Sequence, residues 1–179
     1  MKRVHDMPFG ASVVADGTRF RLWAPTAERI ELVLDGARPR DLPMWRDDDG
    51  WYEALVPGIG HGACYRYRVN GELLVPDPAA RFNPRDVGGP SMVIDPTRHR
   101  WRDANWRGRP WHEAVIYEVH VGTGSETGTF RGLEARLGEL ADLGVTALEL
   151  MPIAEFPGAR NWGYDGVLPF APDASYGTP

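Results

Sequence analysis

Two glutamates and a histidine fall on stretches that are typical of buried strands, and together they could carry general acid–base chemistry. Glu118 and His120 lie two residues apart in VIYEVHV, so they share one face of an extended strand. Glu149 occupies the comparable place in VTALELM. Carboxylates beside an imidazole can transfer protons. The alternative, which we favour on the residues alone, is that these charges pair with arginine or lysine of later strands and only stabilise packing.

A second group of candidates follows the second of these strands, in FPGARNWGYDGVLPFAPDASY. Asn161, Trp162, Tyr164 and Asp165 are clustered there. Aromatic rings offer apolar faces to the C–H surface of a sugar, while Asn and Asp side chains hydrogen-bond to hydroxyl groups. The alternative is a loop that buries its own rings. The residue types do not decide between these two interpretations.

Two other groups are weaker candidates. His61 and Cys64 lie in a glycine-rich turn, but no second His or Cys stands near them, so we expect neither a metal site nor a nucleophile. Trp101, Trp106 and Trp111 are interleaved with arginines, a composition that can stack on bases. A net charge of -5 argues against a nucleic-acid partner. We expect a linker whose indoles hold two domains together.

The elements that must position these residues divide the chain into two parts. Up to about residue 94, short segments alternate apolar and polar side chains and are separated by tight-turn dipeptides such as Asn70-Gly71. No helical window lies between them. This pattern is typical of a small all-β, immunoglobulin-like sandwich.

The second part changes period. Strands at 115–121 and 145–151 flank an apolar stripe at helical spacing, formed by Phe130, Leu133, Leu137, Leu140 and Ala141. Strand–helix–strand predicts a βαβ unit that opens a larger, incomplete α/β domain, such as a (β/α)8 barrel, because two strands cannot close a barrel. Residues 153–179 are expected to be loop-like. The predicted domains are therefore a sandwich at 1–97, a linker at 98–113 and the start of a barrel at 114–179.

Several longer motifs run through both parts. ELMP, EFP and NWGYDGV occur between residues 114 and 177, and FRLWAP, YRYRVNG, PDPAAR and GPSMVIDP occur in the first part. Together they resemble the α-amylase superfamily of glycoside hydrolases, and within it the malto-oligosyltrehalose trehalohydrolases. Glycogen-branching enzymes are also similar, but they typically have a Gln where Asp165 stands.

The resemblance implies a substrate, a reaction and a set of sugar contacts. The whole enzyme would cleave the α-1,4 bond next to the trehalose unit of maltooligosyltrehalose, with retention and without a cofactor. Its catalytic Asp, Glu and Asp would lie on the fourth, fifth and seventh barrel strands, so Glu118 and Glu149 would be interior residues and this chain alone inactive. Tyr164 would stack on the sugar, with Trp162, Asp165 and Asn161 as further substrate contacts.

Other interpretations stay open. The chain could belong to a branching or debranching enzyme, or form an α-glucan-binding module in which Trp23, Trp45 and Trp51 stack on sugar. Packing is the role we favour for these indoles. A third interpretation is self-association through unpaired strand edges. No apolar run approaches the ~20 residues of a membrane helix and no signal-peptide core is present, so we expect a cytoplasmic protein with no membrane partner.

Overall fold

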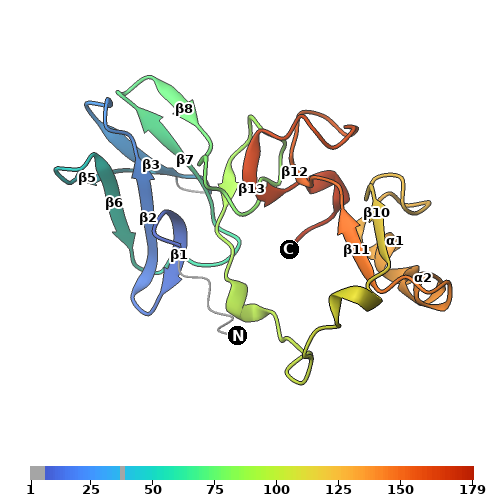
Figure 1. Ribbon diagram of the computed structural model, residues 1–179. Helices are drawn as coiled ribbons and strands as arrows, with labels where there is room; N and C mark the ends of the chain where they lie inside the picture. Colours follow the sequence, from blue (N-terminus) through green and yellow to red (C-terminus); the bar gives the residue numbers. More distant parts are fainter. Residues whose placement is uncertain (1–6, 37–38) are drawn as a thin grey trace.

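The computed structural model describes residues 7–36 and 39–179, and its first half is a sandwich of two antiparallel sheets (Figure 1). One sheet has the order β1-β2-β6-β5, with strands β1 (Gly10–Val14), β2 (Gly17–Trp23), β6 (Trp51–Val56) and β5 (Trp45–Arg46). The other has the order β4-β3-β7-β8, with β9 beside β7; its strands are β3 (Ile30–Leu34), β4 (Arg40–Pro43), β7 (Cys64–Val69), β8 (Leu73–Val75) and β9 (Ser91–Met92).

The sandwich core follows the two-residue period of the sequence. Phe20 of β2, Leu32 of β3 and Tyr67 of β7 are fully buried, and on β2 and β7 the arginines beside Phe20 and Tyr67 are only partly buried. The turn between β7 and β8 has φ of 52° at Asn70 and 83° at Gly71, the left-handed pair that a tight hairpin needs. The prediction of an all-β sandwich is confirmed. Strands β1, β4, β5 and β9 were not predicted from the sequence; β5 and β9 have only two residues each and so show no period.

A buried carboxylate joins β7 to the segment after β8. The hydroxyl groups of Tyr65 and Tyr67 donate to Oδ2 of Asp77 at 2.7 and 3.3 Å, and the amide of Ala79 donates to its Oδ1 at 2.8 Å. Burial raises the pKa of Asp77, and these hydrogen bonds partly oppose the rise. The PDPAAR motif therefore makes a structural turn, which the sandwich core holds in place.

The second half contains the expected parallel strand pair. In β10 (Ile116–Val119) and β11 (Ala147–Leu150), Glu118 lies directly opposite Glu149. The helices α1 (Phe130–Ala135) and α2 (Leu137–Asp142) connect the two strands. Thr129 caps α1 by accepting the Gly132 amide at 3.1 Å. The predicted βαβ unit is confirmed.

The connection differs from a single helix in one respect. The amide of Arg136 bonds to the carbonyl of Leu133 at 3.0 Å, three residues back, and this tighter turn separates α1 from α2. As a result Leu133 and Leu140 are buried, whereas Leu137 is exposed. Leu137 and Ala141 were both expected in the apolar stripe, and that expectation is wrong because both are exposed.

The expectation that residues 153–179 are loop-like is also wrong in part. Strand β12 (Ala154–Glu155) pairs antiparallel with β13 (Leu168–Pro172). Pro169 and Pro172 argued against a strand in the sequence, because proline has no N–H to donate to a sheet. Strand β13 tolerates them because it is an edge strand in which only two residues pair with β12. The described part of the chain also has three 3₁₀ turns, η1 (Pro96–Arg98), η2 (Trp111–Glu113) and η3 (Ala174–Tyr176).

The β12–β13 pair also joins the two halves, since it lies between the sandwich and the β10–β11 pair (Figure 1). The rings of Phe9 and Phe170 are 5.4 Å apart, Ala80 packs with β13, and the amide of Gly158 donates to Asp86 at 2.9 Å. The linker indoles were expected to make this junction. They are exposed, so that expectation is wrong for the residues the structure describes. Among residues 7–36 and 39–179, no helix is long and apolar enough to cross a bilayer.

Candidate functional site

The loop between β12 and β13 holds its aromatic residues away from the core. Oδ1 of Asn161 accepts the amide of Gly163, the amide of Tyr164 at 3.0 Å and that of Asp165 at 3.5 Å. Gly163 has a φ of 102°, which favours glycine there. The side chains of Trp162 and Tyr164 are 86% and 72% exposed. The interpretation that this loop buries its own rings is therefore wrong for these two residues.

The loop is attached to the end of β10 through His120. Its Nε2 lies 2.8 Å from the carbonyl oxygen of Asn161 and 3.3 Å from the hydroxyl oxygen of Tyr176. The Tyr176 ring is buried against the rings of Phe130 and Phe156, with centroids 5.9 and 5.6 Å away. Sequence analysis missed this connection, because His120 and Asn161 are 41 residues apart and no local pattern links them.

This arrangement is suited to binding a sugar. Two exposed rings and the carboxylate of Asp165 on one tethered turn suit the apolar faces and hydroxyl groups of a sugar. Glu118 and Glu149 lie opposite each other on exposed positions of β10 and β11, and His120 is engaged by the loop. The geometry thus brings His120, but not the glutamates, into contact with the candidate loop.

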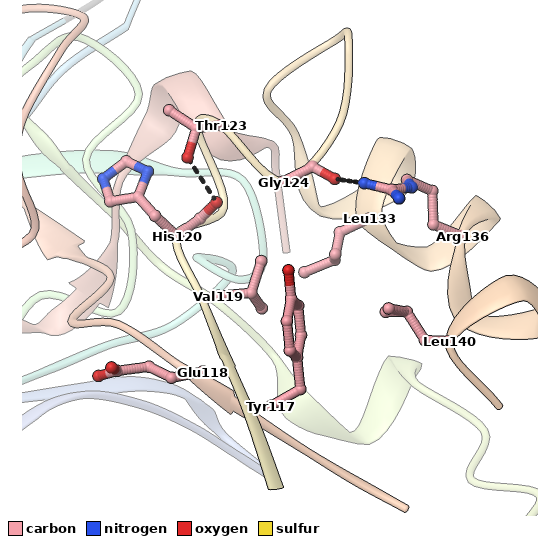
Figure 2. Close-up of a pocket in the computed structure, with 9 residues that line it drawn as sticks. All are labelled: Tyr117, Glu118, Val119, His120, Thr123, Gly124, Leu133, Arg136 and Leu140. Carbon is pink, nitrogen blue, oxygen red and sulfur yellow. Dashed lines mark hydrogen bonds between the residues drawn. The ribbon is translucent and has the colours of Figure 1, made fainter. Parts of the chain in front are cut away.

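A hollow of about 240 Å³ lies on the other side of β10, between this strand and the helices. Figure 2 shows Tyr117, Leu133 and Leu140 pointing into it, while the side chains of Glu118 and His120 point to the opposite side of the strand. Arg136 donates to the carbonyl of Gly124 at 2.7 Å beside it. The hollow is a feature of helix packing and does not belong to the 161–165 loop.

Comparison with known proteins identifies the chain. Residues 8–96 match the family model of carbohydrate-binding module 48, the isoamylase N-terminal domain. The chain is 41% identical over 173 residues to the malto-oligosyltrehalose trehalohydrolase of Saccharolobus solfataricus, an alignment that covers 97% of this chain and 30% of that protein. With the trehalohydrolase of Deinococcus radiodurans it shares 44% identity, over 91% of this chain and 26% of that protein. The chain belongs to the malto-oligosyltrehalose trehalohydrolase family.

Other matches are named as a glucan branching enzyme, an alpha amylase and a pullulanase. A 1,4-alpha-glucan branching enzyme of Xanthomonas axonopodis is 40% identical, over 95% of this chain and 27% of that enzyme. A Salmonella typhimurium protein described as an alpha amylase superposes with a TM-score of 0.92 at 45% identity, over 98% of this chain and 30% of that one. The pullulanase of Anoxybacillus sp. LM18-11, solved with maltotetraose, has a TM-score of 0.80 at 25% identity. The match covers 97% of this chain and 30% of the pullulanase. This trehalohydrolase-family chain thus spans about 30% of the length of the curated relatives it matches.

The sandwich of this trehalohydrolase-family chain carries a second aromatic surface, on the outer face of the β1-β2-β6-β5 sheet. Trp23 and Trp45 are 59% and 70% exposed, so neither is packed in the sandwich core. The Trp23 indole donates to the carbonyl of Asp49 at 3.1 Å, which holds its plane. Trp51 is half-buried, opposite Trp23, with the Arg21 guanidinium 4.7 Å from its ring centroid.

His61 and Cys64 have structural roles. The Nδ1 of His61 accepts the amide of Asp95 at 3.2 Å, and burial raises the pKa of the Cys64 thiol, which lowers its nucleophilic fraction. Within residues 7–36 and 39–179, no group of three His, Cys, Asp or Glu side chains is placed to hold a metal ion.

A buried glutamate lies at the base of the segment that carries the loop. Glu155 is 1% exposed and accepts the amide of Ala174 at 2.9 Å, while Asp173 accepts the amide of Phe156 at 3.0 Å. Burial raises the pKa of Glu155 to about 7, and the charges of Asp173 and Asp86 add to the rise. Glu155 therefore changes charge near neutral pH at the base of β12.

We expect Glu155→Gln to stabilise the fold in a pH-dependent way. A carboxyl whose pKa is higher in the folded than in the unfolded chain contributes stability at low pH that is lost as pH rises from about 4.5 to about 7. Glutamine stays neutral and keeps the acceptor for Ala174. The free energy of unfolding should then exceed that of the parent by roughly 3 kcal/mol near pH 8 and by less than about 1 kcal/mol near pH 5. Urea unfolding at both pH values measures this.

The matched control is the exposed Glu126→Gln, for which the difference should be small at both pH values. An equal effect of Glu155→Gln at the two pH values would show that Glu155 does not carry the raised pKa.

Proposed function

We propose that this chain is part of a glycoside hydrolase that releases trehalose from maltooligosyltrehalose, by cleaving the α-1,4 bond next to the trehalose unit with retention. Trp162, Tyr164 and Asp165 contact the sugar, and Asn161 belongs to the same loop. The observation that carries this proposal is the exposure of the Trp162 and Tyr164 rings on a loop fixed by hydrogen bonds. The names of the relatives supply the substrate class.

The position of the loop agrees with the site of a barrel enzyme. We take β10 and β11 as the first two strands of a (β/α)8 barrel, in which loops after the carboxyl ends of the strands form the active site. The 161–165 loop follows β11 and is tied to the end of β10 by His120. A retaining glycosidase needs two carboxyl groups ~5–5.5 Å apart across the scissile bond, and we assign these to later strands.

The test compares two polypeptides on purified maltooligosyltrehalose. The full-length protein that contains residues 1–179 should release trehalose, and residues 1–179 alone should release none above a buffer blank. Release by the short chain would overturn the assignment of the catalytic carboxyls to later strands. Formation of branched glucan without trehalose by the full-length protein would replace the proposed reaction with that of the branching enzymes.

The outer face of the sandwich supports a second function, α-glucan binding. Trp23 pairs with Trp51 of β6 and Trp45 pairs with Glu53, two residues further along that strand. With ~4.8 Å between neighbouring strands and ~3.4 Å per residue along a strand, the Cα atoms of Trp23 and Trp45 are roughly 12 Å apart. Two exposed rings at such a separation can stack on sugar units of one chain. The held plane of Trp23 favours this role, since little side-chain entropy is lost on binding.

We expect Trp45→Ala to abolish the retardation of this protein in amylopectin gels. Trp106→Ala is the matched control, because Trp106 is equally exposed in the linker but lies outside the sandwich face. Retardation that survives Trp45→Ala, or equal loss in both variants, would exclude this face as the glucan-binding surface.

A further inference from the structure

We infer that Asn161 and His120 are positioning residues, which together hold the turn that presents the Tyr164 ring. The Oδ1 atom of Asn161 and the Nε2 atom of His120 bind the protein backbone and not the sugar. This inference rests on the proposed function, because it assumes that Tyr164 contacts the substrate. It adds that the position of the Tyr164 ring depends on the hydrogen bond between His120 and Asn161, which are 41 residues apart in the sequence.

The side-chain oxygen of Asn161 is fully used inside the loop. A carbonyl-type oxygen has two lone pairs. Oδ1 of Asn161 already lies within hydrogen-bonding distance of three consecutive backbone amides, those of Gly163, Tyr164 and Asp165. It therefore has no capacity left for a sugar hydroxyl. Its effect is to bend the backbone around one atom, with Gly163 in the left-handed region, so that the rings on either side of this glycine are exposed.

His120 fixes where this turn stands. The carbonyl of Asn161 can only accept, so the Nε2 of His120 carries the hydrogen that is donated over 2.8 Å. The other ring nitrogen, Nδ1, is then an acceptor, and it is buried without a donor among the described residues. Tyr176 approaches the same Nε2 and is itself buried among aromatic rings. The turn is thus connected to the core at the end of β10.

The Asn161 step is tested by two substitutions in the full-length protein. Asn161→Ala removes the acceptor and should lower kcat/KM for maltooligosyltrehalose by roughly 10-fold, since a loosely held group is misplaced for part of the time. Asn161→Asp keeps the acceptor but loses the amide NH₂, and should recover most of that loss. Hydrogen exchange of the peptide that contains residues 163–165 should accelerate in the alanine variant and remain slow in the aspartate variant.

The role of His120 is tested by a similar pair of substitutions. His120→Ala removes the donor to the carbonyl of Asn161, whereas His120→Gln offers a side-chain amide that can donate to it. We expect faster exchange of the 163–165 peptide in the alanine variant than in the glutamine variant. Thermal unfolding is recorded for every variant, so that a general loss of folding is recognised.

The outcomes separate this inference from the proposed function. Equal losses of activity in Asn161→Ala and Asn161→Asp, with unchanged exchange, would make Asn161 a sugar contact and overturn the inference. Normal activity in Asn161→Ala beside impaired Tyr164→Ala would also overturn it, and leave the proposed function standing. If Tyr164→Ala has no effect, the proposed sugar contact fails; the exchange measurements then decide alone whether Asn161 and His120 hold the turn.

Discussion

Replacing Tyr164 by alanine is expected to lower kcat/KM of the full-length protein for maltooligosyltrehalose by roughly 70-fold. The ring is 72% exposed, so it is available to a ligand without rearrangement of the core. Covering about 100 Å² of apolar ring surface at ~25 cal/mol per Å² contributes about 2.5 kcal/mol, which corresponds to that fold-change. Initial rates of trehalose release at several substrate concentrations give the value.

Two controls make this result specific. Tyr164→Phe keeps the ring and should lose little, because stacking needs the face and not the hydroxyl group. Trp106→Ala removes an exposed indole from the linker and should leave the kinetics unchanged. Unchanged kinetics in Tyr164→Ala would contradict the assignment of this loop to the sugar site.

The second large effect is expected on stability. Asp77→Ala should lower the free energy of unfolding by about 3 kcal/mol, because it leaves three buried donors without their acceptor. These are the hydroxyl groups of Tyr65 and Tyr67 and the amide of Ala79. Urea unfolding, followed by circular dichroism, measures the difference.

The exposed Asp48→Ala is the matched control and should change the free energy of unfolding by less than about 0.5 kcal/mol. Tyr67→Phe should cost less than Asp77→Ala, since it removes one donor together with the need for its acceptor. A loss below about 1 kcal/mol in Asp77→Ala would show that water replaces the carboxylate.

Only some features of the 161–165 loop could be predicted from the sequence. Residue types in NWGYD suggested sugar contacts, and the clustering of Trp162, Tyr164 and Asp165 was visible without coordinates. That the two rings are exposed was not predictable, because a loop of this composition can equally bury them. For His120 the sequence favoured a structural role over proton transfer, but it could not predict the partner, which is the backbone carbonyl of Asn161.

Periodicity by itself determined the sandwich strands, the Asn70-Gly71 hairpin and the strand–helix–strand unit, because alternation and helical spacing are local properties of the chain. Tertiary structure decided three things that local patterns do not contain. It paired the proline-containing β13 with β12, left the linker indoles exposed, and brought His120 to Asn161. Each of these three features depends on contacts between segments that are distant in the sequence. The free energy of such contacts depends on how the segments pack, which residue types alone do not specify.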